Sequence, residues 1–177
     1  RDRPEDVLQA AREAAQKEGR EGWKLSLKAP CYIPVMQYAE NRSLRERMYR
    51  AYVTRASEFD TAQAGVAPRD NAPLISRILK LRRESAKLLG FANYAEVSLA
   101  TKMAKGPGEV TTFLRDLARK SLPFARRDHE ELKAFARDEL SLPDLAAWDL
   151  SWASEKLRIK RYAFSDQEVK QYFPEDK

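Results

Sequence analysis

The chain has 177 residues, of which 43% are hydrophobic and 34% are charged, and its formal net charge is +6 at pH 7. This balance is typical of one soluble, highly charged globular domain, and no apolar run is long enough to cross a bilayer. The single cysteine excludes a disulfide framework and favours a reducing compartment. The 33 basic residues are mixed with 27 acidic ones, so the charge does not indicate nucleic-acid binding.

The N-terminal part of the chain combines one helix with the only strand-like pattern. Pro4 suits the first turn of a helix, and Gly19 ends the helical spacing of apolar residues that follows it. From Trp23 to Leu27 apolar and polar residues alternate, which is the period of a half-buried strand, and two prolines bracket the apolar residues after it. We therefore expect one short strand or β-hairpin near residues 23–33.

The rest of the chain, from Val35 onward, is expected to be helical. Three residue pairs have the spacing of a capping box that starts a helix: Ser43 with Glu46, Asn93 with Glu96, and Ser165 with Glu168. Pro73 opens an unusually apolar helix that ends at Gly90, and its composition predicts a central position in the fold. The sequence thus predicts a mainly α, multi-helical fold, a single helical region over residues 1–177 with no internal boundary.

The longest helical pattern runs from Val110 to Ala136, with Pro123 inside it. In the helix expected after Ser43, periodicity places Arg45 largely off the apolar face. Asp149 has the position and the side chain of an N-cap for a helix that follows it.

The stretch HEELK, His129–Lys133, begins like the helical zinc signature H-E-x-x-H but has lysine where the second histidine should stand. A zinc centre of that kind needs two imidazoles four residues apart and a third protein ligand. Cys31 and His129 are the only thiolate and imidazole groups in the chain. We interpret HEELK as part of the long helix, with His129 on or beside its apolar stripe.

Other catalytic patterns are equally weak. The six glycines form no phosphate-binding motif, and no G-x-S-x-G sequence exposes a serine. Cys31 and His129 could formally pair as nucleophile and base, but a cysteine between prolines in an apolar stretch is more often a buried thiol. We therefore predict no catalytic, cofactor-binding or metal-binding residue in this chain, and periodicity does not identify substrate-binding residues.

Several stretches taken together resemble one protein family: GWKLSLKAPCYIPVMQYAENRSLRERMYRAYVTRAS, ILKLRRESAKLLGFANYAEVSLATKMA, PGEVTTFL, WDLSWASEKLR and YFPEDK. They are similar, in the same order and over nearly the whole chain, to the segment that precedes the catalytic core in the thimet oligopeptidase family of zinc metallopeptidases. The resemblance implies a mostly helical parent protein, a zinc metalloendopeptidase whose two lobes enclose a channel for short peptides. The family's H-E-x-x-H helix lies C-terminal to the matched region.

The resemblance implies that this chain is a noncatalytic segment of such an oligopeptidase, forming part of the channel wall and scaffold. Zinc is then expected in the parent and not in this segment, and the isolated chain is expected to be inactive. The implied partners are the remainder of the parent chain and short peptides as its substrates, in the cytoplasm, with no nucleic acid and no membrane. The first residue is Arg rather than Met, as in a processed protein or a piece of a longer one.

The alternative is a free-standing helical module that binds a protein or peptide in an apolar groove. A segment cut from a larger protein is instead expected to expose apolar surface and to self-associate.

Overall fold

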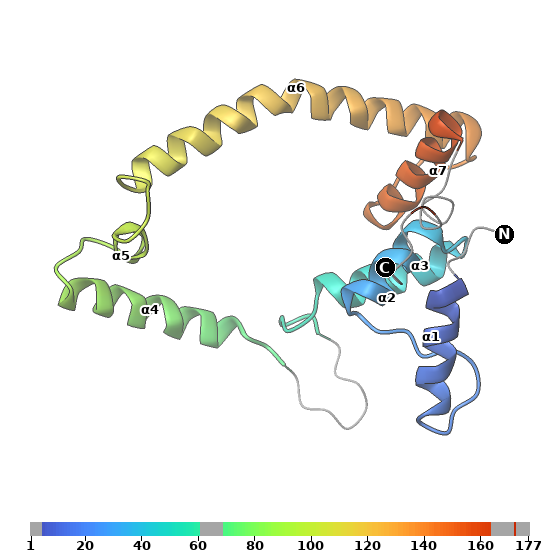
Figure 1. Cartoon of the computed structure of the whole chain (residues 1–177), viewed down its shortest axis with the longest axis horizontal. Coiled ribbons are helices and arrows are strands. Elements are labelled where there is room, and N and C mark those ends of the chain that lie inside the picture. Colours follow the sequence, from blue (N-terminus) through green and yellow to red (C-terminus); the bar gives the residue numbers. More distant parts are fainter. Residues whose placement is uncertain (1–4, 61–68, 164–171, 173–177) are drawn as a thin grey trace. The chain divides into compact units, whose positions relative to one another are not determined.

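The computed structural model describes residues 5–60, 69–163 and 172. Its helices are α1 (Glu5–Gln16), α2 (Ala29–Tyr38), α3 (Arg42–Val53), α4 (Ala72–Leu88), α5 (Tyr94–Leu99), α6 (Pro107–Glu139), the 3-10 helix η1 (Ala147–Asp149) and α7 (Leu150–Tyr162) (Figure 1). No strand occurs in these described ranges. The predicted mainly α, multi-helical fold is therefore confirmed. None of the described helices is both long and apolar enough to span a membrane.

The predicted strand or β-hairpin near residues 23–33 is wrong. The alternating segment from Trp23 to Leu27 is irregular, and its apolar residues Leu25 and Leu27 pack against the core beside α2 without a second strand. The apolar residues that follow belong to α2, which begins at Ala29 with a proline in its first turn, where a missing backbone N–H costs nothing. The alternation of apolar and polar residues therefore predicts neither the backbone conformation nor the pattern of burial here, since Trp23 is exposed and Ser26 is as half-buried as the two leucines.

The chain divides into two compact units. Unit 1 combines the segments Arg1–Val53 and His129–Lys177, and unit 2 is the segment Thr54–Asp128 between them. The expectation of a single helical region over residues 1–177, part of a larger oligopeptidase, stays a prediction.

The hydrophobic core of unit 1 forms around α2, which contacts α1, α3 and α7. Val35 and Met36 of α2 and Met48 of α3 are its buried centre. The side chains that pack around them are Leu25, Leu27, Tyr32, Ala39, Leu44, Tyr49 and Trp148. Residues from both chain segments of unit 1 therefore share one core.

Unit 2 has far less buried surface. Of its described residues, 54–60 and 69–128, only Ala86 is buried. The apolar side chains of α4 are exposed: Leu74, Ile75, Ile78, Leu79, Leu81 and Leu88. The expected central position of this helix is thus not met within this chain, because nothing described here covers its apolar face.

The capping predictions have mixed outcomes. At α5, Asn93 Oδ1 accepts a hydrogen bond from the backbone N–H of Glu96 at 3.1 Å, which confirms the predicted cap. At α3 the cap is not Ser43, because the helix begins at Arg42 and the backbone N–H of Leu44 donates to Asn41 Oδ1 at 3.0 Å. The pair Ser165 and Glu168 lies outside the described residues.

Candidate functional site

Unit 1 contains an ionic cluster, formed by the exposed Arg42 and the buried Arg45 of α3 and the buried Asp149 of η1. Asp149 is fully buried and Arg45 is only 2% exposed. Asp149 Oδ1 accepts a hydrogen bond from Arg45 Nη2 at 2.7 Å, and Oδ2 accepts one from Arg42 Nη2 at 2.8 Å. The cluster therefore joins α3 to a segment more than 100 residues away in the sequence, since Arg45 and Asp149 are separated by 104 positions.

Further contacts of the cluster satisfy some of the groups that burial would otherwise leave unpaired, although Arg45 Nε is buried without a hydrogen-bond partner among the described residues. Arg42 and Arg45 are three residues apart, so both can face the same side of α3. Arg45 Nη1 donates to the backbone oxygen of Ala39 at 2.6 Å, and its guanidinium group lies 4.5 Å from the ring centre of Trp152. Buried charges are tolerated only with such partners, because taking an ion out of water is costly.

The pKa of Asp149 indicates a structural rather than a catalytic carboxylate. Burial acts to raise this pKa, but hydrogen bonds from Arg42, Arg45 and the backbone N–H of Ala146 outweigh it and hold the pKa below its ordinary value. The side chain is thus ionised at neutral pH and has its oxygens occupied by donors. It has no proton to give and is not poised to take one from a substrate.

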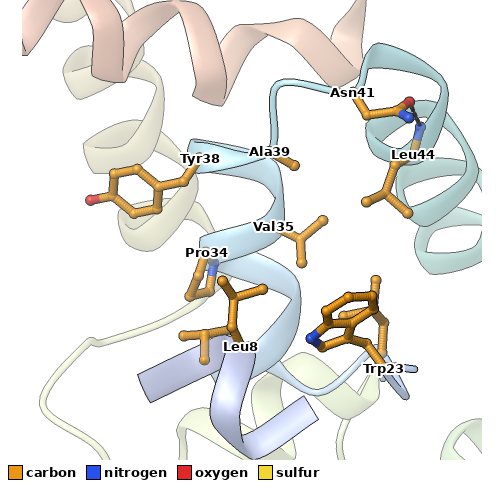
Figure 2. A pocket seen from close by; sticks show the side chains of 10 residues that line it. Leu8, Trp23, Pro34, Val35, Tyr38, Ala39, Asn41 and Leu44 are labelled. Carbon is orange, nitrogen blue, oxygen red and sulfur yellow. Dashed lines mark hydrogen bonds between the residues drawn. The ribbon is translucent and has the colours of Figure 1, made fainter. Parts of the chain in front are cut away.

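An apolar pocket of about 330 Å³ is the second feature of unit 1. It is lined by Val7, Leu8, Trp23, Leu25, Pro34, Val35, Tyr38, Ala39, Asn41 and Leu44. Figure 2 shows Val35 and Leu44 pointing toward the space beside Trp23. The amide oxygen of Asn41 is engaged in capping α3, so the pocket suits an apolar group rather than acid–base chemistry.

A larger and more polar hollow, of about 610 Å³, also lies within unit 1 and is partly lined by Arg42, Glu130, Lys133, Arg137 and Asp144. Its charges are already compensated by neighbouring groups. Lys133 Nζ pairs with Glu130 at 3.0 Å, and Arg137 Nε pairs with Asp138 at 2.7 Å. The hollow therefore offers no concentrated positive field for an anionic ligand.

The structure places the residues of the zinc-like stretch on an ordinary helix. HEELK lies inside α6, which confirms its interpretation as part of the long helix. His129 is exposed, so it does not line a buried core, and the buried part of this helix begins at Leu132. Among the residues the structure describes, no group of three or more His, Cys, Asp or Glu side chains could hold a metal ion.

Cys31, the other residue considered in a nucleophile–base pair, is partly buried near the start of α2. Its sulfur accepts a hydrogen bond from the backbone N–H of Ser26 at 3.3 Å. This contact links the irregular segment before α2 to the start of that helix, so the thiol has a structural role. That the chain carries no catalytic, cofactor-binding or metal-binding residue stays a prediction.

The sequence does not predict the ionic cluster. Periodicity put Arg45 off the apolar face of its helix, and Asp149 was expected to cap α7 through its side chain. Asp149 is at the N-cap position of α7, but its side chain does not cap that helix. It accepts hydrogen bonds from Arg42 and Arg45 instead. The one local signal was the three-residue spacing of Arg42 and Arg45, and it carries no information on the acidic partner.

Comparison with known proteins places the chain among peptidases. The family model described as Peptidase family M3 matches residues 35–177. The chain is 47% identical over 174 residues to oligopeptidase A of Haemophilus influenzae, covering 98% of this chain and 25% of that protein, and 46% identical over the same length and coverage to oligopeptidase A of Escherichia coli. It is 42% identical over 179 residues to probable cytosolic oligopeptidase A of Arabidopsis thaliana, covering 96% of this chain and 24% of that protein. The chain thus spans about a quarter of the length of these curated relatives.

Proposed function

This chain belongs to peptidase family M3, and from that membership we propose that it is a noncatalytic segment of a longer zinc oligopeptidase. In the parent it forms part of the wall and scaffold of the channel that admits short peptides. The observation that carries the proposal is the 47% identity to an oligopeptidase along 98% of this chain but only 25% of that protein. A match that covers nearly all of this chain and only a quarter of that protein supports one structural part of a larger peptidase.

The chemistry of unit 1 supports a scaffold role. Its most deeply buried charged residues, Arg45 and Asp149, form an ion pair with each other and so join two segments of the chain. The pocket beside Trp23 is apolar, and the described residues that line it include no cluster of acids and bases. Positioning and support are therefore what this arrangement can provide.

Zinc supplies a polarised carbonyl and an activated water in peptide hydrolysis by metallopeptidases. The described residues of this chain do not fit that metal, because they bring together no set of three suitable ligands and the only histidine has Lys133 four residues after it. We therefore assign the zinc ligands to the remainder of the parent, and this chain contributes no step that involves the metal.

The proposal is tested by reading the source coding frame beyond the codon for Lys177. Continuation into an H-E-x-x-H helix with a downstream glutamate supports a zinc oligopeptidase parent, and a stop codon contradicts it. A second measurement addresses the noncatalytic role. The purified 177-residue chain, given zinc, is expected to leave a fluorogenic short peptide uncleaved, and turnover comparable to that of the longer product contradicts the role.

A cytoplasmic location and short peptide substrates follow from the same proposal. The names of the relatives support peptidase activity; one Arabidopsis relative is named as probable cytosolic and another as organellar. Subcellular fractionation with an antibody to this chain tests the location, with recovery in the membrane or secreted fraction as the contrary result.

The apolar pocket favours one other candidate, a free-standing module that binds a peptide or helix through an apolar groove. Trp23 lines the pocket and is 57% exposed, so its fluorescence is expected to respond to an occupant. A saturable change on titration with apolar peptides, together with a stop codon after Lys177, would favour the module over the oligopeptidase segment.

A further inference from the structure

Helix α6 has one apolar stripe that is buried at one end and exposed at the other. Counted at 3.6 residues per turn, one face of the helix carries Val110, Phe113, Leu114, Leu117, Phe124, Leu132, Phe135 and Ala136. The last three belong to unit 1 and are buried there. Within unit 2, by contrast, Phe113 is 61% exposed, Leu117 is 48% exposed and Phe124 is 59% exposed.

The exposed part of this stripe has the character of an interface. We define the α6 stripe as Phe113, Leu114, Leu117 and Phe124, four large apolar side chains spread along three turns of one helical face. Soluble proteins seldom leave several large apolar side chains of one helical face in water unless that face meets another surface. On the same helix, Leu132, Phe135 and Ala136 pack within unit 1, which shows that this helical face can be a packing surface.

We infer that the α6 stripe docks on an apolar surface of the remainder of the parent oligopeptidase. This inference rests on the proposed function, and it names the surface through which the segment is held. The chain spans only 25% of the length of its bacterial relatives, so a parent of that size has ample further chain to cover the stripe.

The charges around the stripe favour a protein partner over a membrane surface. Asp128 lies on the same helical face between Phe124 and Leu132 and is exposed, although it pairs with Arg127 at 3.2 Å. A carboxylate in the centre of the face opposes insertion into an anionic lipid surface. Asp116, on the flank, holds both Arg119 and Lys120 at 2.6 Å and so reduces the positive charge offered to lipid.

Helix α4 differs from α6 in the charged residues beside its apolar face. Beside its exposed apolar residues the helix carries five basic residues and a single acid, Glu84; the basic residues are Arg77, Lys80, Arg82, Arg83 and Lys87. That composition is common to membrane-surface helices and to basic protein-binding helices. We therefore restrict the inference to the α6 stripe.

The test compares Phe113→Asp and Leu117→Asp with the control Thr112→Asp, in the 177-residue chain and in the longer gene product. Thr112 is exposed on the same helix but lies off the stripe. In the longer product we expect the two stripe variants to lower the melting temperature by several degrees, and the control to leave it unchanged. In the 177-residue chain the stripe variants should leave the melting temperature unchanged, because the stripe is already in water there.

Other outcomes overturn the inference in distinguishable ways. Equal losses in both backgrounds mean that the substitutions only weaken α6 itself. A dimer of the 177-residue chain that the stripe variants disperse, with no effect in the longer product, means that a second copy is the occupant. Binding of the longer product to phosphatidylserine-containing vesicles, lost in the stripe variants, means a membrane partner.

The failure of this inference can be separated from that of the proposed function. If the coding frame stops at Lys177, both fail. If it continues into the peptidase and the stripe variants leave the melting temperature of the longer product unchanged, only the docking inference fails.

Discussion

The two units use the same kind of amphipathic helix with opposite results. In unit 1 the apolar faces of α2 and α3 meet within the chain, and two oppositely charged residues, Arg45 and Asp149, are buried beside them. In unit 2 the helices α4 and α5 contact each other, yet Ala86 is the only buried residue among those described. Helix formation and burial are therefore separate steps, and unit 2 completes only the first with its own residues.

The largest effect is expected from removing the acid of the ionic cluster. Asp149→Ala leaves Arg45 buried without its counter-charge, which we expect to lower the free energy of unfolding of unit 1 by about 3–5 kcal/mol. Urea denaturation followed by tryptophan fluorescence measures this, since Trp148 and Trp152 lie in unit 1. Asp144→Asn is the control. Asp144 is exposed, and its contact with the cluster is a hydrogen bond from Arg42 Nη2 to its backbone oxygen, which the substitution keeps. Equal losses in the two variants would show that the cluster adds nothing to the stability of unit 1.

A pair of phenylalanines on one helical face compares the two units directly. Phe135 is 8% exposed in unit 1, whereas Phe124 is 59% exposed in unit 2. In the 177-residue chain we expect Phe135→Ala to cost about 3 kcal/mol and Phe124→Ala to cost little, because only the first empties a packed site. Chemical denaturation of both variants measures the difference. Similar losses of unfolding free energy in the two variants would mean that Phe124 is buried in solution and that the two units do not differ in burial at these positions.

The ionic cluster also predicts how unit 1 responds to acid. The pKa of Asp149 is lower in the folded protein than its ordinary value of about 3.9, so its contribution to stability is present above that value. This contribution is lost as the pH falls through the folded pKa. We expect the melting temperature of unit 1 to decrease when the pH is lowered past about 4. The decrease should be less steep in Asp149→Asn, which has no carboxylate to protonate at this position. Parallel curves of melting temperature against pH for the two proteins would contradict a stabilising role of the ionised Asp149.

Local features of the fold could be predicted from sequence, and long-range ones could not. The cap of α5 depends on Asn93 and Glu96, three positions apart, and the end of α4 depends on Gly90, which has a φ of +80°. The bond between Arg45 and Asp149 spans 104 positions, so no local pattern reveals it. The strand predicted at Trp23–Leu27 is wrong because five alternating residues do not fix a backbone conformation without a second strand to pair with, and Leu25 and Leu27 pack against α2 instead.

The position of α4 was missed for a related reason. Its pattern shows that one face, with Leu74 and Ile78 on it, suits burial, but a pattern cannot show which surface covers that face. In the described part of this chain no surface does, and both side chains are about half exposed. The family resemblance supplied what periodicity could not, namely a larger protein in which such a face could be covered.

The smallest expected effect lies in unit 2 and concerns its capping rather than its burial. Asn93→Ala removes the acceptor for the backbone N–H of Glu96 and should cost about 1 kcal/mol in the local stability of α5. Hydrogen exchange of the α5 amides measures this change, with Asn93→Ser as a control that keeps an acceptor. Because unit 2 has so little core, capping is a large share of what orders α5, and exchange should quicken there while the unfolding of unit 1 stays the same. An unchanged exchange rate in Asn93→Ala would mean that α5 is held by its packing against α4, where Arg82 lies 5.0 Å from the ring centre of Tyr94, and not by its cap.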